Sequence, residues 1–391
     1  MRKSVLAITM NILIDVRPLM DERYSGVAEY TYELLSALFK IDSSNQYFLY
    51  YNSARDLLGR LPNFTQANVS YIRTHYPNKI FNYCLVMPFD RPRLDRYIGS
   101  GIDIFFMPHV NFSAWSPSVK SVVAVHDLSF LIYPEVFNWR KNIWHGLLRV
   151  RRLMKKTTAV VAVSENTKAD IINYGGAATE KVKTILSGLS ADFKKLPPED
   201  PALLAVKKRY RLPEKFIFFL STVEPRKNIE CLLRAFDLLK KKPRNENIKL
   251  LIAGGRGWKS KAVYSLAKKL ACSSDIEFLD YVDRNDKVYL YNAATLFAYP
   301  SLYEGFGHPP LEAMACGTPT ILGSSSSLPE VAGDAALLVD PYNPTALAAA
   351  IESIIMDADL AAALSEKGIE QAKRFTWEKT ARQYLDLFES L

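Results

Sequence analysis

Short apolar segments alternate with longer helical patterns along this chain, and this order limits the fold more than any other feature. The apolar segments are 12–16, 47–51, 69–72, 104–107, 122–126 and 159–163 in the first half, and 216–220, 249–253, 276–278, 296–299, 320–322 and 336–339 in the second. Continuously apolar segments are typical of parallel strands that are covered on both faces. Helical patterns fit between them, for example at 28–39, 229–240, 260–271 and 345–356. The sequence therefore predicts an α/β protein with two successive doubly wound domains.

A segment rich in proline and charge separates the two halves. It reads KKLPPEDP at 194–201, a composition typical of a connection between domains. We expect an N-terminal domain of residues 1–195 and a C-terminal domain of residues 196–374. The length of 391 residues agrees, because it exceeds what one hydrophobic core usually holds.

Composition excludes several classes of protein. Hydrophobic residues make up 49% and charged residues 23% of the chain, which are values of a globular protein and not of a disordered or coiled-coil one. The 4 cysteines form no CxxC pair, which disfavours a disulfide scaffold and a cysteine-based zinc site. No apolar run is long enough to span a bilayer, and no small-residue cleavage site follows the apolar N-terminus. We expect a cytoplasmic protein, with Met1 and Met10 both open as the natural start.

The positive charge is concentrated in the first half. Residues 1–195 hold 25 Lys and Arg against 16 Asp and Glu, whereas residues 196–391 hold 25 of each, so the net charge of +9 comes from the first half. Seven of these cations lie in 140–156, where no acid occurs. We expect one basic amphipathic helix there, with Arg149, Arg152 and Lys156 away from its apolar stripe.

Two interpretations of this basic segment remain open. It is either a solvated helix face or a peripheral contact with an anionic membrane surface or an anionic acceptor. A nucleic-acid partner is not expected, because no DNA- or RNA-binding motif accompanies the charge.

The segment 299–319 carries the strongest functional signal. A predicted strand ends at Tyr299, the glycine-rich loop 305–307 follows, and Pro309-Pro310 opens a helix. Glycines let backbone N–H groups approach an anion, and a helix N-terminus adds positive potential, so the pattern predicts a phosphate site, although a tight turn alone also explains the glycines. Glu304, which we expect on an exposed loop end where its loss leaves the fold intact, and Glu312 flank this loop.

A pair of cations follows another predicted strand. Arg226 and Lys227 come after the segment 216–220 and just before a helix. Cations at the carboxyl end of a strand suit a diphosphate, while an exposed basic loop is the alternative.

Together these motifs resemble the retaining glycosyltransferases of family 4, which have the GT-B fold. The resemblance is carried by EPRKN at 224–228, by PSLYEGFG at 300–307 and by two glutamates with seven residues between them. DVRPL at 15–19, VHDL at 125–128, VSENT at 163–167, LPEVAG at 328–333 and FTWE at 375–378 extend it over nearly the whole chain. HDLSF at 126–130 and YPEVF at 133–137 look most like bacterial mannosyltransferases of surface-polysaccharide assembly.

The resemblance implies two Rossmann-like domains that face a central cleft, with a terminal helix at about 375–391 crossing back to the first domain. It implies a retaining glycosyltransferase that needs no metal or other cofactor. The donor would be a nucleotide-sugar, with GDP-mannose favoured, and the acceptor a glycan or polyprenyl-linked sugar. A UDP-sugar-dependent family 4 transferase and a nucleotide-sugar epimerase of the same fold remain alternatives. A nicotinamide oxidoreductase is disfavoured, since no GxGxxG motif follows an early strand.

The resemblance also implies roles for individual residues. Glu304 would hold sugar hydroxyls, Arg226 and Lys227 would neutralise the leaving diphosphate, and His126 would contact the donor sugar or the acceptor hydroxyl. These four form the predicted catalytic set. The predicted donor-binding residues, with Glu312 on the ribose, are Gly26, Tyr281, Val282, Gly305, Phe306, Gly307, Leu311 and Glu312. The predicted acceptor or membrane contacts are Asp127, Arg149, Arg152 and Lys156.

One departure from the family pattern concerns the cations. Thr222 stands where many members carry an arginine, so Arg226 would have to supply that charge.

Overall fold

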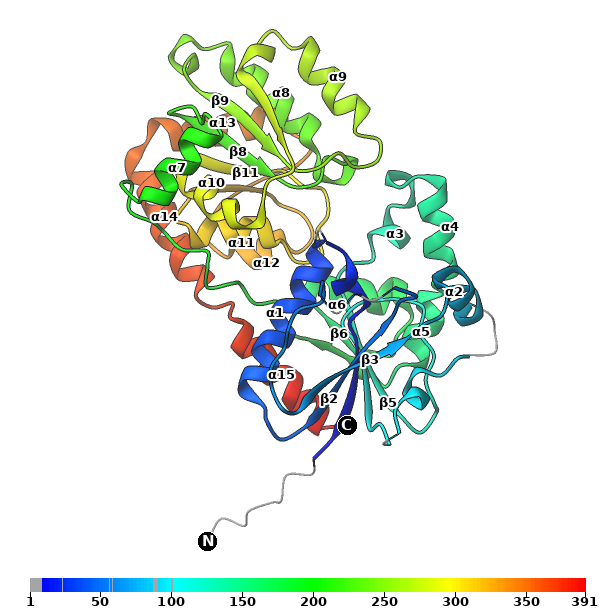
Figure 1. The fold of residues 1–391 in the computed structure, drawn as a ribbon. Helices are drawn as coiled ribbons and strands as arrows, with labels where there is room; N and C mark the ends of the chain where they lie inside the picture. The colour runs from blue at the N-terminus through cyan, green and yellow to red at the C-terminus, as the bar shows by residue number, and fades with distance from the viewer. Residues whose placement is uncertain (1–8, 23, 56, 58, 87–90, 100) are drawn as a thin grey trace. The chain divides into compact units, whose positions relative to one another are not determined.

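The computed structural model describes residues 9–391 except 23, 56, 58, 87–90 and 100. Its contacts divide the chain into two compact units (Figure 1). The first unit comprises the chain up to Ile132, Trp139–Gly188 and Thr376–Leu391, and the second comprises Tyr133–Asn138 and Leu189–Phe375. The division after Gly188 precedes the expected boundary at 195, and the transfer of Tyr133–Asn138 to the second unit was not expected.

The first unit is built on a parallel seven-stranded sheet in the order β3-β2-β1-β4-β5-β6-β7. Its strands follow the predicted apolar segments, except β7, which was not predicted. Their bounds are β1 Asn11–Asp15, β2 Gln46–Asn52, β3 Val69–Thr74, β4 Ile104–Met107, β5 Lys120–Val125, β6 Ala159–Ala162 and β7 Val182–Thr184. The strand order reverses between β1 and β4, and doubly wound sheets bind ligands at such a point.

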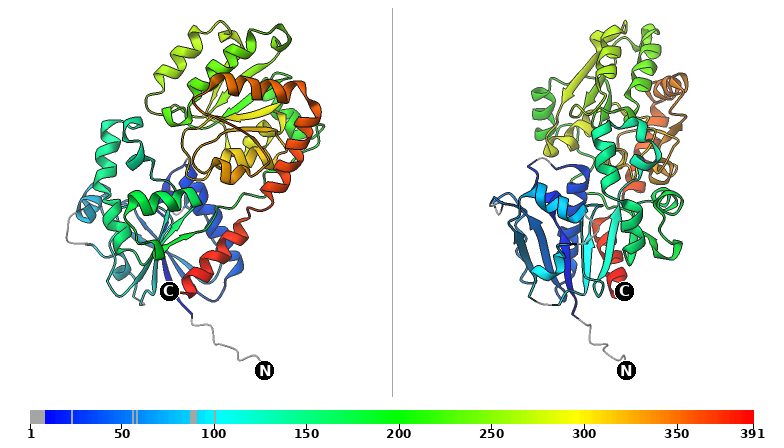
Figure 2. Two further views of the ribbon diagram at one scale, coloured as in Figure 1. Left: turned by 180° about the vertical axis from the view of Figure 1, so that it is seen from behind. Right: turned by 90° about the vertical axis from the view of Figure 1, so that its right-hand side faces the viewer.

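Helices cover both faces of this sheet (Figures 1 and 2). They are α1 Gly26–Ile41, α2 Asn78–Val86, α3 Ser129–Ile132, α4 Trp139–Leu147, α5 Val150–Lys156, α6 Glu165–Asp170 and α15 Trp377–Glu389. The terminal helix α15 packs on α1, where the hydroxyls of Tyr30 and Tyr384 lie 2.7 Å apart, and Thr380 donates to the Leu186 carbonyl. The expected return of the terminal helix to the first unit is therefore confirmed.

The prediction of a single basic helix at 140–156 is wrong. Helix α4 ends at Leu147 and α5 begins at Val150, because Arg149 between them adopts a left-handed conformation with φ 47°. The expected apolar stripe is divided as well: Val150 and Met154 are buried, whereas Ile143 and Leu147 are exposed. The helical spacing of apolar residues continues through this break in the backbone, so the sequence does not show where α4 ends and α5 begins.

The second unit contains a parallel six-stranded sheet in the order β10-β9-β8-β11-β12-β13. Its strands are β8 Phe216–Leu220, β9 Lys249–Ala253, β10 Ile276–Asp280, β11 Leu296–Tyr299, β12 Thr320–Gly323 and β13 Leu337–Val339. Its helices are α7 Pro201–Arg209, α8 Ile229–Lys240, α9 Lys261–Lys269, α10 Lys287–Ala293, α11 His308–Ala315, α12 Leu328–Ala332, α13 Pro344–Met356 and α14 Ala358–Ala372. All five residues of β8 are buried, as the continuous apolar pattern predicted.

The short segment Tyr133–Asn138 packs onto the second unit. The indole nitrogen of Trp258 donates to the Val136 carbonyl at 2.7 Å, and the rings of Phe137 and Trp258 stack with centroids 5.4 Å apart. Tyr133 meets Tyr303 edge-on at 5.6 Å. The segment therefore lies against the loop that carries Glu304.

No helix in the described part of the chain is long and apolar enough to cross a membrane.

Candidate functional site

Two loops of the second unit meet where its strand order reverses. Strands β8 and β11 are parallel neighbours, with Leu296 opposite Ile217 and Phe297 opposite Phe218, so their carboxyl ends reach the same edge of the sheet. The loop after β8 carries Glu224, Arg226 and Lys227, and the loop after β11 carries Glu304. We call these four side chains the charge cluster.

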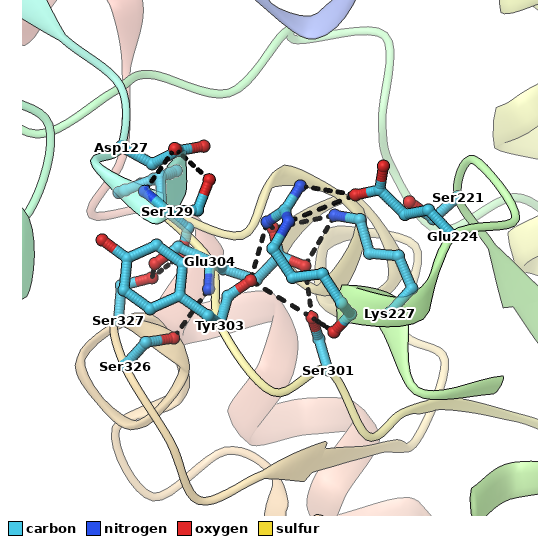
Figure 3. A network of polar contacts seen from close by, with 12 residues as sticks. Asp127, Ser129, Ser221, Glu224, Lys227, Ser301, Tyr303, Glu304, Ser326 and Ser327 are labelled. Carbon is cyan, nitrogen blue, oxygen red and sulfur yellow. Dashed lines mark hydrogen bonds and ion pairs between the residues drawn. The ribbon is translucent and has the colours of Figure 1, made fainter. Parts of the chain in front are cut away.

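Direct ion pairs join the charge cluster (Figure 3). Lys227 Nζ donates to the two carboxylate oxygens of Glu304 at 2.7 and 2.9 Å and to the Tyr299 hydroxyl at 3.0 Å. Arg226 Nη1 donates to Glu304 Oε2 at 3.1 Å, and its Nη2 lies 2.9 Å from Glu224 Oε1. The cluster thus holds two cations and two carboxylates, whose formal charges cancel. Arg226, the residue expected to supply the cation in place of Thr222, is part of it.

Burial sets the electrostatics of these groups. Glu304 is 6% and Lys227 is 7% exposed. Burial alone would raise the pKa of Glu304, but the charges of Lys227 and Arg226 hold it at about 2. Burial lowers the pKa of Lys227, and Arg226 acts in the same direction, while Glu304 opposes both. At neutral pH the Glu304 carboxylate is therefore charged and held by its neighbours.

The expectation that Glu304 lies on an exposed loop end is wrong. Ser326 Oγ accepts from the Glu304 backbone N–H at 2.8 Å, and Ser327 Oγ donates to the Glu304 carbonyl at 3.0 Å. Ser301 Oγ donates to Glu304 Oε1 at 2.7 Å. These serines hold the loop against the unit, which explains why a glycine-rich segment is buried.

The glycine-rich loop leads into helix α11 as predicted. Gly307 is the N-cap with φ 113°, and a side chain there would be strained because its Cβ would also lie 3.1 Å from Leu328. Prolines occupy the first turn. Phe306 and Leu311, two of the predicted donor-binding residues, are buried.

The other predicted donor-binding residues differ in their environment. Glu312 is buried and accepts a hydrogen bond from the Tyr291 hydroxyl at 2.8 Å. After β10, Val282 is buried whereas Tyr281 is half exposed. Gly26 begins α1 in the first unit, and the space that a side chain would occupy there is open.

The predicted residues after β5 lie in the first unit. His126 Nε2 is 2.8 Å from the Pro108 carbonyl; because a carbonyl can only accept, Nε2 carries the ring proton. Burial lowers the pKa of His126, so the ring is neutral at pH 7. Asp127 accepts from the N–H and hydroxyl of Ser129 at 2.9 and 2.6 Å, which is a helix-capping role.

The basic residues Arg149, Arg152 and Lys156 line a small hollow of about 50 Å³ in the first unit. Lys156 Nζ lies 4.2 Å above the Trp115 ring. All three residues are exposed.

Within the described residues, no three His, Cys, Asp or Glu side chains are placed to hold a metal ion. An Asp-Ala-Asp triplet at 357–359 begins α14, where the Asp357 carboxylate caps the Leu360 N–H.

Comparisons with known proteins identify the family. The family model described as glycosyl transferases group 1 matches residues 205–371, and the model described as glycosyltransferase family 4 matches residues 24–193. O-antigen chain mannosyltransferase B of Escherichia coli is 32% identical over 288 residues, which cover 73% of each protein. The chain belongs to the family 4 glycosyltransferases.

Solved structures of other proteins share the fold of this glycosyltransferase. Sucrose-phosphate synthase from Thermosynechococcus elongatus superimposes with a TM-score of 0.74 at 20% identity, covering 97% of this chain and 98% of that one. The Anabaena protein HepE, solved with UDP-glucose, has a TM-score of 0.70 at 18% identity and covers 98% of this chain and 100% of its own. The predicted GT-B class, with two Rossmann-like domains, is confirmed.

Sequence reasoning missed several residues around the glycosyltransferase's charge cluster. Glu224 was not predicted to belong to it, and Tyr299, Ser326 and Ser327 were not predicted to contact Lys227 or Glu304. Glu224 lies within the EPRKN motif, so its place beside Arg226 was the one local signal. Tyr299 ends β11, the strand that leads into this loop, but its contact is with Lys227, which is 72 residues away. Ser326 and Ser327 lie 22 and 23 residues from Glu304, and only the fold brings them to the loop.

Proposed function

We propose that this glycosyltransferase transfers mannose from GDP-mannose to a glycan or lipid-linked acceptor, with retention at the anomeric carbon and without a metal ion. The observation that carries the proposal is the buried charge cluster at the carboxyl ends of β8 and β11. Similarity to an O-antigen mannosyltransferase supports the choice of sugar. The UDP-glucose complex of a structural neighbour supports a nucleotide-sugar as the donor class.

The cluster suits the departure of a diphosphate. As the bond from the anomeric carbon to the phosphate oxygen breaks, negative charge grows on that oxygen, and Arg226 and Lys227 would stabilise it from fixed positions. In the free enzyme Glu304 holds both cations. A bound diphosphate would compete for them and leave the Glu304 oxygens to accept hydrogen bonds from the sugar hydroxyls. Glu312 would accept hydrogen bonds from the ribose diol, and the loop 305–307 with the start of α11 would hold phosphate.

Glu304 is a poor nucleophile in this arrangement. In the free enzyme its carboxylate is held by two cations, and with donor bound its oxygens would accept hydrogen bonds from the sugar hydroxyls and not face the anomeric carbon. We infer that the acceptor hydroxyl attacks from the face that the phosphate leaves, so that the new carbon–oxygen bond forms as the old one breaks. The acceptor proton passes to the departing phosphate oxygen. His126, with a neutral ring, would contact the reacting hydroxyl or the donor sugar.

The first unit would carry the acceptor and contact an anionic surface on the cytoplasmic side of the membrane. Trp139, Ile143 and Leu147 of α4 are exposed large apolar side chains, and the basic residues of α5 follow directly. An apolar face beside cations is the composition of a peripheral membrane contact.

A donor screen tests the proposed function. GDP-mannose should raise the unfolding temperature more than UDP-glucose or UDP-N-acetylglucosamine does, and it should be consumed faster when a mannose-ended glycan is added. Nuclear magnetic resonance of the product should show the anomeric configuration of the donor. Preferential binding of a UDP-sugar would overturn the donor assignment. Conversion of the sugar to an isomer without any acceptor would indicate an epimerase and overturn the transferase proposal.

A further inference from the structure

An aromatic contact joins His126 to helix α1. The ring of Tyr30 meets the ring of His126 almost at right angles, with centroids 4.5 Å apart and an angle of 87° between the planes. Perpendicular pairs at this distance are favourable, because the edge of one ring faces the electron-rich face of the other. Tyr30 is fully buried, so its ring is a fixed wall for His126.

This ring and one hydrogen bond together define the orientation of His126. Nε2–H donates to the Pro108 carbonyl at 2.8 Å, which fixes the tautomer and leaves Nδ1 as the nitrogen that accepts. A single hydrogen bond still allows the imidazole to turn about it, whereas contact with Tyr30 restricts that rotation. His126 lines a cavity of about 390 Å³ in the first unit, so its orientation decides how Nδ1 meets a ligand there.

The terminal helix α15 in turn holds the Tyr30 ring. The hydroxyls of Tyr30 and Tyr384 form a buried hydrogen bond of 2.7 Å, and the Trp377 ring lies 5.3 Å from the Tyr30 ring at 75°. A buried hydroxyl needs a partner, so each of these tyrosines fixes the other. Helices α1 and α15 lie side by side (Figure 2). Tyr30 therefore connects α15 to His126.

The start of α15 is anchored by close packing. A Cβ at Gly188 would lie 2.4 Å from the Trp377 backbone nitrogen and 2.6 Å from Cγ of its ring, so any side chain at 188 would displace the start of the helix. Thr376 caps α15 by accepting from the Lys379 N–H. These contacts explain the FTWE segment at 375–378 as a support for the Trp377 ring.

We propose that Tyr30 is a positioning residue for the transfer reaction, and that α15 keeps it in place through Tyr384 and Trp377. The inference rests on the proposed function, because the orientation of His126 matters for transfer only if His126 contacts a reacting group. The Tyr30 side chain is buried and its hydroxyl is occupied by Tyr384, so it acts through His126 and not on a substrate. A misplacement of about 1 Å in such a group can cost about 100-fold in rate.

Removal of one hydroxyl from α15 gives the sharpest test. Tyr384→Phe leaves Tyr30 and His126 chemically unchanged, so an effect on His126 has to be transmitted by packing. Exchange of the His126 Nε2 proton with solvent, measured by ¹⁵N-edited NMR at pH 7, reports whether the bond to the Pro108 carbonyl persists. The loss of one neutral hydrogen bond corresponds to about a fivefold change. We therefore expect exchange about fivefold faster and kcat about fivefold lower, with an unchanged KM for GDP-mannose, because the charge cluster lies in the second unit.

Substitution of Tyr30 itself gives a graded series with a matched control. Tyr30→Leu removes the ring and should lower kcat on the order of 100-fold, whereas Tyr30→Phe keeps the ring and should restore activity to the level of Tyr384→Phe. Tyr50→Phe is the control, because Tyr50 is buried in the same unit and its hydroxyl pairs with the Thr74 hydroxyl at 2.8 Å. It should lower Tm as Tyr384→Phe does, without changing proton exchange at His126 or kcat.

The outcomes separate this inference from the proposed function. Wild-type proton exchange at His126 in Tyr384→Phe would overturn the inference even if Tyr30→Leu does not fold. Equal losses of kcat in Tyr50→Phe and Tyr384→Phe would also overturn it, since they would reflect stability alone. Faster exchange with a wild-type kcat would overturn the part of Tyr30 in transfer, together with the proposed contact of His126. If the wild-type protein transfers no sugar but exchange is faster in Tyr384→Phe, the proposed function fails while the support of His126 by α15 stands.

Discussion

Replacement of Glu304 by glutamine tests whether the balance of charge within the cluster stabilises the loop after β11. Glutamine keeps the size of the side chain and can still accept from Ser301, but it removes the negative charge that Lys227 and Arg226 face. Those cations have side chains only 9% and 14% exposed, so Glu224 alone would balance them. Removal of one partner from a buried ion pair costs about 3–5 kcal/mol. From the sequence we expected that loss of Glu304 leaves the fold intact. The structure instead predicts that this substitution lowers the free energy of unfolding.

The pKa of Glu304 gives a second measure of the same effect. Its folded value of about 2 lies below the ordinary 4.5, a difference that corresponds to about 3 kcal/mol. Because the folded pKa is the lower one, the stabilisation is complete above about pH 4.5 and is lost as the pH falls towards 2. Burial lowers the pKa of Lys227, so that residue gains less from the pair, and the expected loss lies at the lower end of the range of about 3–5 kcal/mol.

Thermal unfolding at pH 7 measures the effect. For a domain of this size about 3 kcal/mol corresponds to a fall of about 6–12 °C in Tm. The difference between Glu304→Gln and wild type should narrow as the pH falls from 4.5 towards 2. Glu370→Gln is the control, because the Glu370–Lys373 pair is exposed and such pairs contribute at most about 1 kcal/mol. A Glu304→Gln protein as stable as this control at pH 7 would refute the reasoning.

The remaining predictions concern catalysis and binding. Lys227→Met should lower kcat more than it weakens GDP-mannose binding, because its charge faces charge that grows towards the transition state; a change confined to KM would contradict this. Transfer should persist in EDTA, and a loss restored by magnesium would refute the metal-free proposal. Glu312→Gln should weaken GDP binding about tenfold in calorimetry, and undiminished affinity would remove Glu312 from the ribose site. Replacing three basic residues by glutamine should reduce sedimentation with anionic vesicles without changing donor hydrolysis, because each cation near the surface contributes about 1 kcal/mol of binding free energy. Sedimentation equal to that of wild type would show that these residues only face solvent. These cations are Arg149, Arg152 and Lys156.

Much of the fold follows from local pattern. The segments 104–107, 216–220, 249–253 and 296–299 form strands with the predicted bounds, and α8 spans the predicted 229–240, because a strand covered on both faces must be apolar throughout. Strand β7 was not predicted because it is short and only Val182 of its three residues is buried, so it lacks a continuous apolar pattern. The prediction of a single basic helix was wrong because helical periodicity reflects only the spacing of side chains. It contains no sign of the left-handed backbone at Arg149, which separates α4 from α5.

The sequence by itself determined which chemical groups the site contains, since a glycine-rich loop before a proline-started helix and a basic loop after a strand are local patterns. Only the tertiary structure decided how these groups are paired. Lys227 and Glu304 are 77 residues apart, and they meet because β8 and β11 are neighbours in the sheet. The same contact buries Glu304 and fixes its charge. Burial and pairing depend on which strands and helices lie together, and that arrangement is a property of the whole fold.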